Sequence, residues 1–469
     1  MPKKPSQVIL EKFPFTPTTG QKHLFSLFDE FLAKPTGSRA TLMLKGYAGT
    51  GKTSVLSALV KALPSFGYRS TLLAPTGRAA KVMSSYTRRT AFTIHKIIYQ
   101  RTADPYSGKI QFRRKRNYQQ KTIFIVDEAS MISDEAGLAG DSLLYDLITY
   151  VFEHDTNRLM LIGDTAQLPP VGQTLSRGLD PEYLSADYRL DILQTELNEV
   201  MRQDLASGIL RNATALREEL TKEKFKISFS TRKYTDIYRM TAEKLEDGLR
   251  YAYEKFGKDN TAIITRSNRE AVQYNQYIRR NIFFFENEIE AGDYLMIVKN
   301  NYYFLGDDAP AGFLANGDFV EIQRVVDFED LYGLRYATLE LRLLDYPDQT
   351  PFEAKVILNT LHSPTPALPD EDHQKLYQQV LEEYSQAENK KEQMEAVRND
   401  MYLNALQVKF AYALTCHKSQ GGQWDAVFVS QGYLREDNIN HEYLRWLYTA
   451  LTRAKSELYL MNFKPEFFE

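Results

Sequence analysis

A glycine-rich turn at residues 46–53 constrains the fold of this chain more than any other stretch. An apolar run, 40–44, leads into the turn, and the segment 52–63 after it carries apolar residues at helical spacing. The turn fits the pattern G-x-x-x-x-G-K-[ST], whose backbone N–H groups close around phosphate oxygens at a helix N-terminus. A flexible structural loop is the alternative, and the strand–turn–helix context counts against it. The stretch therefore predicts a nucleoside triphosphate site.

Individual side chains around this turn have predicted parts in the chemistry. Lys52 can reach the β- and γ-phosphates, and Thr53 can hold Mg²⁺. An apolar strand, 122–126, ends in two carboxylates about 75 residues after Lys52. Of these, Asp127 would hold the metal and Glu128 would polarise an attacking water. The predicted nucleotide-binding residues of the turn are Gly46, Ala48, Gly49, Thr50, Gly51, Lys52, Thr53 and Ser54.

Length and composition set outer bounds. The 469 residues predict two to four domains, and a hydrophobic content of 43% is ample for buried cores. The single cysteine, Cys416, excludes an internal disulfide and a cysteine-rich metal site. No apolar run approaches the ~20 residues that span a bilayer, and the N-terminus lacks a signal-peptide core. We therefore expect a soluble, cytoplasmic protein.

Charge is distributed unevenly along the chain. Residues 31–126 contain 18 Lys or Arg and one acidic residue, which gives +17, so the other residues carry −20 to reach the net charge of −3. Such asymmetry is typical of a protein that binds a polyanion. A solvated basic face is the alternative, but charge on this scale costs self-repulsion.

The order of predicted elements indicates an insertion within a repeated architecture. Strands and helices alternate from the start of the chain, which predicts a parallel sheet with helices on both faces. The alternation is interrupted by a strand-rich stretch that predicts a small antiparallel barrel, and it resumes with QVKFAYALT as one strand. The predicted domains are 1–195 with a basic hairpin at 101–121, a second α/β domain of 196–290 and 405–469, and an inserted barrel with a charged helical extension at 291–404.

Eight segments occur in an order typical of one enzyme family. They are GYAGTGKTS, LLAPTGRAAKVM, TIHKII, IFIVDEASMI, LIGDTAQLPPVG, ELNEVMRQ, YALTCHKSQGGQWDAVFV and WLYTALTRAKSELYLM. Together they resemble the motif series of superfamily 1 helicases, and the variants VDEASM and CHKSQG resemble its 5′→3′ branch of RecD-like, Pif-like and Dda-like enzymes. In its length and its inserted barrel the chain is most similar to the Dda-like members.

The resemblance implies two RecA-like motor domains, an SH3-like barrel, and ATP with Mg²⁺ as cofactors. It implies that Arg202 and Arg453 reach the phosphates from the second domain, a task that suits the planar fork of arginine. It also implies that Gln21 reads the adenine edge and that Gln423 lines the same cleft. Gln167, at the tip of the strand 158–164, could sense the γ-phosphate, with a surface turn as the alternative.

A track for single-stranded DNA is implied as well. Its matching residues are Pro75, Thr76, Gly77, Thr93, His95, Thr415, His417 and Lys418. Small hydroxyls and backbone amides suit phosphate contacts that carry no sequence information. On the hairpin, Phe112 could stack on a base while Arg113 and Arg114 hold phosphates. A core position for Phe112 is the alternative, and Tyr106 and Tyr118 are rival stacking residues.

Four functions remain open at this point. The first is an ATP-driven 5′→3′ helicase acting as a monomer on single-stranded DNA and at single/double-strand junctions, with single-strand-binding or replication and repair proteins as candidate partners. The second is a translocase that strips proteins without unwinding, and the third is an RNA-tracking relative. The fourth is a binding module with a vestigial phosphate loop, against which the joint presence of the predicted catalytic residues counts. The polarity rests on the resemblance alone.

Overall fold

The computed structural model describes residues 3–103, 110–135, 141–201, 206–306, 309–346 and 348–469, with the side chains of 101–112 outside the description. The first lobe is a six-stranded sheet, parallel throughout, in the order β3-β2-β6-β7-β1-β8. Its strands are β1 (Ala40–Gly46), β2 (Arg69–Ala74), β3 (Ala91–Thr93), β6 (Thr122–Val126), β7 (Arg158–Gly163) and β8 (Asp191–Leu197).

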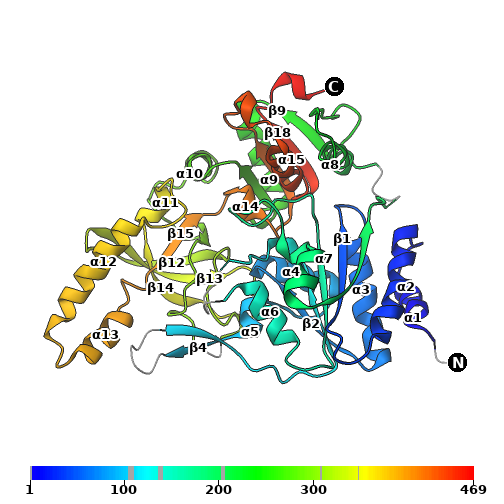
Figure 1. The fold of residues 1–469 in the computed structure, drawn as a ribbon. Coiled ribbons are helices and arrows are strands. Elements are labelled where there is room, and N and C mark those ends of the chain that lie inside the picture. The colour runs from blue at the N-terminus through cyan, green and yellow to red at the C-terminus, as the bar shows by residue number, and fades with distance from the viewer. Residues whose placement is uncertain (1–2, 104–109, 136–140, 202–205, 307–308, 347) are drawn as a thin grey trace.

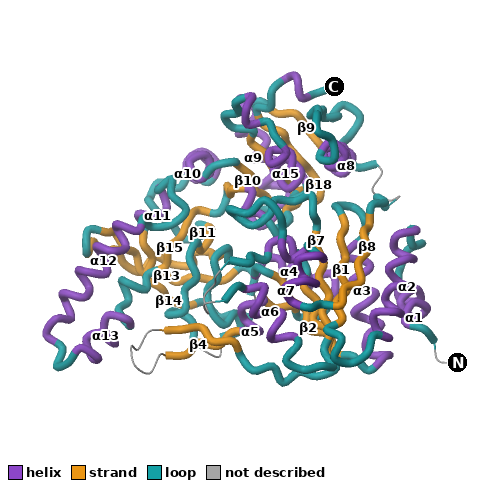
Figure 2. Tube along the Cα trace, in the orientation of Figure 1, coloured by secondary structure: helices purple, strands orange, loops and turns teal. Residues whose placement is uncertain are grey.

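Helices cover both faces of this sheet, as Figure 2 shows. One face carries α1 (Pro5–Lys12), α2 (Thr19–Ala33), α3 (Lys52–Ala62) and α4 (Gly77–Thr87), and the other carries α5 (Ile94–Ile98), α6 (Leu143–Val151) and α7 (Pro181–Tyr188). Successive side chains of a strand point to opposite faces, so Leu42 and Leu44 pack on the first set of helices and Met43 packs on the second.

The second lobe repeats the plan with five parallel strands in the order β16-β10-β17-β18-β9. The strands are β9 (Ile237–Met240), β10 (Thr261–Thr265), β16 (Ala413–Thr415), β17 (Trp424–Ser430) and β18 (Ala454–Met461), and the helices are α8 (Gly208–Glu219), α9 (Leu245–Phe256), α10 (Asn268–Tyr277), α14 (Cys416–Ser419) and α15 (His441–Leu451). Two parallel α/β sheets of this kind confirm the predicted fold class (Figure 1).

A closed barrel stands beside the two lobes (Figure 1). It consists of β11 (Tyr294–Ile297), β12 (Phe319–Leu331), β13 (Leu334–Leu343), β14 (Phe352–Ile357) and β15 (Leu406–Phe410). Between β14 and β15 the chain forms α11 (Asn359–His362), α12 (Asp370–Glu383) and α13 (Lys390–Arg398). Leu376, Val380 and Val397 of these helices pack on Tyr336 and Ile357 of the barrel.

The sequence expectation was wrong in two details of this barrel. β14 pairs with β15 in parallel, because the long helical excursion returns the chain to the same end of the barrel. The stretch 407–415, expected as one strand, is divided between two sheets. The division falls where the side-chain oxygen of Asn275 accepts hydrogen bonds from the backbone N–H groups of Tyr412 (3.0 Å) and Ala413 (2.7 Å).

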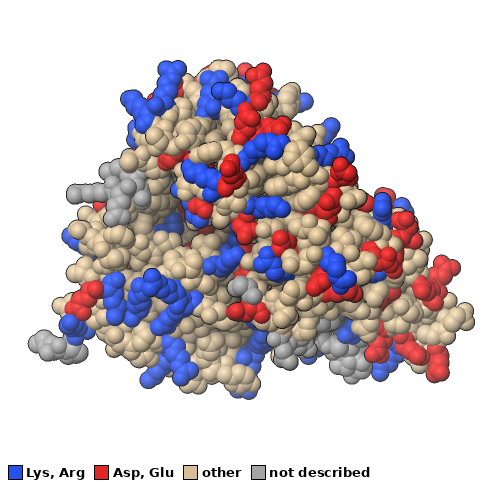
Figure 3. Space-filling view, turned by 180° about the vertical axis from the view of Figure 1, so that it is seen from behind, with Lys and Arg blue, Asp and Glu red and all other residues tan. Residues whose placement is uncertain are grey.

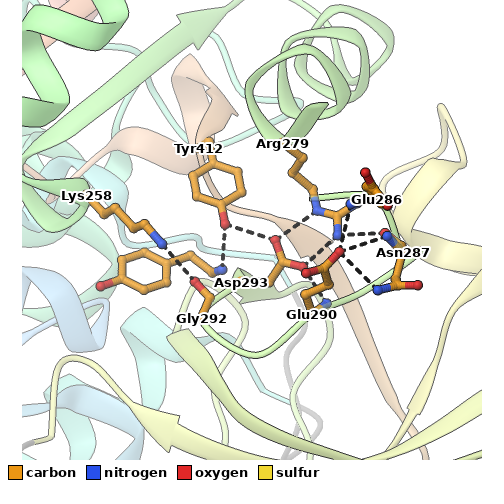
Figure 4. Close-up of polar contacts among 9 residues, drawn as sticks. Lys258, Arg279, Glu286, Asn287, Glu290, Gly292, Asp293 and Tyr412 are labelled. Carbon is orange, nitrogen blue, oxygen red and sulfur yellow. Dashed lines mark hydrogen bonds and ion pairs between the residues drawn. The ribbon is translucent and has the colours of Figure 1, made fainter. Parts of the chain in front are cut away.

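A buried polar joint ties the barrel to the second lobe (Figure 4). Asp293, at the entrance to the barrel, accepts two hydrogen bonds of 2.8 Å from the guanidinium of Arg279. The hydroxyl of Tyr412, just past the exit, donates to the same carboxylate at 2.9 Å. Asp293 is fully buried, and a buried ion pair is tolerated only when both partners are satisfied. The segments of chain that enter and leave the barrel are therefore both bound to the side chain of Asp293.

We expect Asp293→Ala to lower the free energy of unfolding by about 3–5 kcal/mol, because it leaves the buried Arg279 charge without a partner. Urea denaturation followed by circular dichroism measures the loss. The matched control is Glu340→Ala, which removes the partner of Arg324 in an exposed ion pair of 3.1 Å and should cost no more than about 1 kcal/mol. Equal losses for the two variants would contradict the structural role given to the joint.

A beta-hairpin projects from the first lobe next to the barrel (Figure 1). It is formed by β4 (Tyr99–Ala103) and β5 (Ile110–Arg114), paired antiparallel. On the face shown in Figure 3, Lys and Arg side chains gather over the first lobe, and acidic side chains are frequent at the opposite edge, where α12 and α13 lie. Among the described residues, no helix is long and apolar enough to cross a membrane.

Candidate functional site

The glycine-rich turn links β1 to α3 and encloses the Lys52 side chain. Lys52 Nζ donates to the backbone carbonyls of Gly46 (2.6 Å) and Tyr47 (2.8 Å). Gly51 has φ of 81°, a conformation that other residues rarely adopt, and a Cβ there would lie 2.7 Å from Nε2 of Gln21. The turn thus holds a lysine beside a helix N-terminus, which is the arrangement that binds phosphate.

Gln21 is bound to this turn from α2. It is fully buried, its Nε2 donates to the carbonyl of Thr50 at 3.0 Å, and its Oε1 accepts from the backbone N–H of Thr18 at 3.1 Å. Gln21 is therefore both a capping residue of α2 and a support of the phosphate turn. Its reading of an adenine edge stays a prediction.

Three carboxylates follow neighbouring strands at the same edge of the first sheet. Asp127 and Glu128 follow β6, and Asp164 follows β7. Asp127 accepts a hydrogen bond of 2.6 Å from the hydroxyl of Tyr86. Burial raises the pKa of Glu128 to about 7, the nearby charges of Arg453 and Lys52 oppose the rise, and Asp127 and Asp164 add to it. Glu128 is thus a carboxyl group poised to exchange a proton near neutral pH.

Arg453 approaches Glu128 from the second lobe. It follows α15, is 3% exposed, and donates to the carbonyls of Thr449 (3.0 Å) and Gly422 (3.2 Å). Its charge is the strongest of those that hold the pKa of Glu128 down. Lys52 and Arg453 therefore lie within electrostatic reach of one carboxyl group from opposite lobes.

The loop after β7 carries the contact between the lobes. Gln420 Nε2 donates to the carbonyl of Leu168 at 2.7 Å, and the Thr449 hydroxyl accepts from the N–H of Leu168 at 2.9 Å. Gln167, between these contacts, is 6% exposed, and its Oε1 has no hydrogen-bond partner among the described residues. An unpartnered buried acceptor in a cleft suggests a place for a ligand or water.

The predicted DNA contacts of both lobes converge on one loop of the barrel, residues 312–318. Lys418 Nζ donates to Asn316, the His95 ring lies 6.3 Å from the Phe313 ring, and a Cβ on Gly77 would lie only 2.6 Å from Oδ1 of Asp318. Segments of the two lobes that are far apart in sequence therefore meet at this loop.

Other predicted DNA contacts are engaged locally. The hydroxyls of Thr76 and Thr93 cap the helices that follow them, accepting from Ala79 N (3.2 Å) and Lys96 N (3.3 Å). Pro75 precedes Thr76 at the end of β2, and Thr415 and His417 are half-buried at α14. Burial lowers the pKa of His95 to about 4 and that of Lys418 to about 8. His95 is therefore neutral near pH 7.

The structure describes only some of the predicted DNA-contacting side chains of the hairpin. The side chain of Phe112 lies outside the description, as do Tyr106 and Arg202, and their roles stay predictions. Arg113 is exposed, whereas Arg114 forms an ion pair of 2.9 Å with the buried Asp146. Arg114 thus anchors the base of the hairpin, and its guanidinium is already occupied.

The role of Gln423 beside the nucleotide stays a prediction. This residue lines a separate cavity of about 270 Å³ where α4, the barrel and the second lobe meet. In the wall of this cavity the guanidinium of Arg78 lies between the rings of Phe319 (4.7 Å) and Trp424 (4.3 Å). No residue that lines the cavity belongs to the phosphate turn.

Sequence reasoning missed two side chains of α15 that contact the first lobe. Arg445 donates to the carbonyl of Thr165, and the Tyr448 hydroxyl accepts from the backbone N–H of Ala48. Tyr448 and Thr449, which also contacts the first lobe, follow Arg445 by three and four residues, so all three lie on one face of the helix. The spacing indicates a helix face, but it does not indicate which partner that face meets.

The comparisons with known proteins agree with this geometry. Residues 29–231 match the model of an AAA domain, and residues 410–461 match that of a UvrD-like helicase C-terminal domain. The chain is 35% identical over 130 residues to the ATP-dependent RecD2 DNA helicase of Deinococcus radiodurans, covering 28% of this chain and 16% of that protein. It is 28% identical over 204 residues to the ATP-dependent DNA helicase Dda of Enterobacteria phage T4, covering 43% of this chain and 42% of that protein.

Other matches extend over most of the chain. The uncharacterized protein R530 of Acanthamoeba polyphaga mimivirus is 23% identical over 483 residues, 89% of this chain and 94% of that protein. A solved structure of two coordinating Pif1 helicases at forked duplex DNA covers 97% of this chain and 94% of its own, with 15% identity and a TM-score of 0.48.

The site thus brings together a phosphate turn, strand-end carboxylates and an arginine from a second parallel sheet. In its motif series and over the matched segments, the chain is similar to superfamily 1 helicases of the RecD-like, Pif-like and Dda-like branch.

Proposed function

We propose that this chain is an ATP-driven DNA helicase that moves 5′→3′ along single-stranded DNA and separates duplex strands. The observation that carries the proposal is the closure of the second lobe on the phosphate turn: the Tyr448 hydroxyl accepts a hydrogen bond of 2.9 Å from the backbone N–H of Ala48, and Arg453 follows the same helix. A site completed only when two lobes meet can convert nucleotide binding and release into opening and closing. The RecD2 and Dda relatives are named as ATP-dependent DNA helicases, which supports DNA as the track.

In this proposal the chain's residues divide the work of phosphoryl transfer. Lys52 and the turn amides hold the β- and γ-phosphates, and Arg453 meets the charge that develops on the transferred group. Glu128 accepts the proton of the attacking water, and Gln167 orients that water with its free Oε1. We propose that Arg202, assigned by resemblance, shares the role of Arg453.

Mg²⁺ fits the oxygen donors at the edge of the first sheet. Thr53 has an exposed hydroxyl at the first turn of α3, and Asp127 offers a carboxylate. Hard oxygen ligands of this kind are those that Mg²⁺ prefers. When bound, the ion would neutralise charge on the phosphates.

The DNA would lie where the two lobes meet the loop 312–318. His95 and Lys418 contact this loop from different lobes, so a change in the distance between the lobes would move two DNA-binding segments relative to each other along one strand. The excess of basic residues in the first lobe supplies the sequence-independent attraction to phosphate.

ATP hydrolysis with matched DNA and RNA oligonucleotides tests the proposal. We expect single-stranded DNA to raise kcat strongly, RNA to raise it less, and Lys52→Ala to abolish turnover while DNA binding persists. The proposal would be contradicted if neither nucleic acid changes kcat for ATP hydrolysis, or if Lys52→Ala keeps the wild-type kcat.

The pH dependence of hydrolysis should follow Glu128. Because burial raises its pKa to about 7, the group is an effective base above that pH and a neutral acid below it. We therefore expect kcat/KM for ATP to fall about tenfold per unit as the pH drops below 7. A pH–rate profile measures this, with ADP binding at each pH as the control. A profile that stays level down to pH 5.5 would rule out a raised pKa.

A further inference from the structure

Tyr448 contacts the phosphate turn from the second lobe. It lies on α15 and is 1% exposed. Its hydroxyl accepts a hydrogen bond of 2.9 Å from the backbone N–H of Ala48 and donates one of 2.7 Å to Oδ2 of Asp164. One hydroxyl group therefore joins the turn, the end of β7 and the second lobe.

Further groups of the second lobe enclose the same part of the turn. A Cβ on Gly49 would lie 3.0 Å from Cδ1 of Leu210, and the guanidinium of Arg217 lies 4.4 Å from the centre of the Tyr47 ring. Tyr448 packs with Ala166 and Ala213 in a small buried cluster. In such a dry contact, a donor or acceptor left without its partner bears its full desolvation cost.

Tyr448 and Arg453 are placed by the same piece of chain. Arg453 follows the last turn of α15, and its Nε is bound to the carbonyl of Thr449, the residue after Tyr448. Asp164, which receives the Tyr448 hydroxyl, also contributes to the raised pKa of Glu128. These contacts therefore fix the position of the end of α15 relative to both the strand-end carboxylates and the phosphate turn.

We propose that Tyr448 is a positioning residue for phosphoryl transfer: its hydroxyl docks α15 on Ala48 and Asp164 and thereby sets Arg453 against the phosphate site. The proposal rests on the function proposed above and deepens it. Tyr448 acts when the lobes are together, so its loss should affect the chemical step and leave the binding of nucleotide to the first lobe unchanged.

Tyr448→Phe tests the proposal, because it removes the hydroxyl and keeps the ring. We expect kcat of DNA-stimulated hydrolysis to fall about tenfold, which corresponds to one buried hydrogen bond of about 1.4 kcal/mol. KM for ATP and the Kd for ADP should stay within about twofold of wild type, since neither depends on a docked α15. Thermal unfolding of each variant reports on the fold.

Tyr443→Phe is the matched control. Tyr443 lies on the same helix, is 2% exposed and is stacked on Trp446 at 5.7 Å, but its hydroxyl has no hydrogen-bond partner among the described residues. This variant should keep kcat at the wild-type value. A Tyr448→Phe enzyme with unchanged kcat, or an equal loss in both variants, would overturn the proposal.

A double-mutant cycle separates positioning from a general loss of packing. If Tyr448 acts through Arg453, Tyr448→Phe should lower kcat much less in an Arg453→Lys background than in wild type. Independent, additive losses would overturn the proposal even if Tyr448→Phe lowers stability. If DNA does not change the rate of ATP hydrolysis by the wild-type protein, the proposed function is contradicted instead. The double-mutant cycle can then still be measured from the rate of hydrolysis without DNA.

Discussion

Arg453→Ala should lower kcat for DNA-stimulated ATP hydrolysis by about 10³–10⁵-fold, the largest effect we expect from a single substitution. The charge that spreads over the transferred phosphoryl group would lose the arginine brought to it by the second lobe. ATP binding should change little, because the phosphate turn and Lys52 belong to the first lobe. Steady-state kinetics with saturating single-stranded DNA gives kcat and KM separately.

Two further variants sharpen this test. Arg453→Lys keeps the charge without the planar fork and should recover only part of the loss. Lys455→Ala, two residues on, removes a cation that forms a surface ion pair of 3.2 Å with Asp425 and should leave kcat unchanged. An Arg453→Ala protein that folds and retains a tenth of wild-type kcat would refute the role of this arginine.

Glu128→Gln should lower kcat by about 10²–10⁴-fold, because the amide keeps the shape of the side chain but cannot accept a proton from water. Nucleotide binding should be preserved or tightened, since a negative charge beside the phosphates is removed while Lys52 and Arg453 stay. The protein should then accumulate with ATP bound, closed on DNA.

Rapid-quench hydrolysis and fluorescence anisotropy on labelled DNA measure the two halves of the Glu128 prediction. Glu30→Gln, an exposed acid of α2, is the control and should behave as wild type. Loss of ATP binding together with hydrolysis in Glu128→Gln would show a structural defect. Unchanged kcat would assign the base to another group.

Much of the fold could be predicted because its signals are local. The phosphate turn between an apolar run and a helical pattern fixes one strand of a parallel sheet, and the strand before Asp127 fixes a second. The barrel was recognisable from alternating polarity. The division of 407–415 between two sheets could not be predicted, because it depends on Asn275, which contacts this stretch only in the folded chain.

In the site, too, the residues that could be predicted are those with a local sequence pattern. Lys52, Glu128 and Arg453 stand in patterns whose chemistry limits the residue types. Arg114 stands in an equally suggestive pattern, yet the folded chain engages it in an ion pair with Asp146.

Two contacts could not be read from sequence at all. Asp318, in the turn ANGD, reads as an ordinary turn residue until the fold brings it against Gly77. Tyr448 reads as a core residue of an amphipathic helix until its hydroxyl meets Ala48, 400 residues away. Both lie where separate units of the fold meet, and such meeting points leave no local pattern.

Strand separation on tailed duplexes tests the central claim most directly. The substrate is a labelled duplex with a single-stranded tail at either its 5′ or its 3′ end, mixed with the protein and ATP. A 5′→3′ motor built from two lobes predicts ATP-dependent unwinding of the 5′-tailed duplex, little unwinding of the 3′-tailed one, and none with Arg453→Ala. Failure of the wild-type protein to open either duplex, or unwinding by Arg453→Ala at the wild-type rate, would contradict this account.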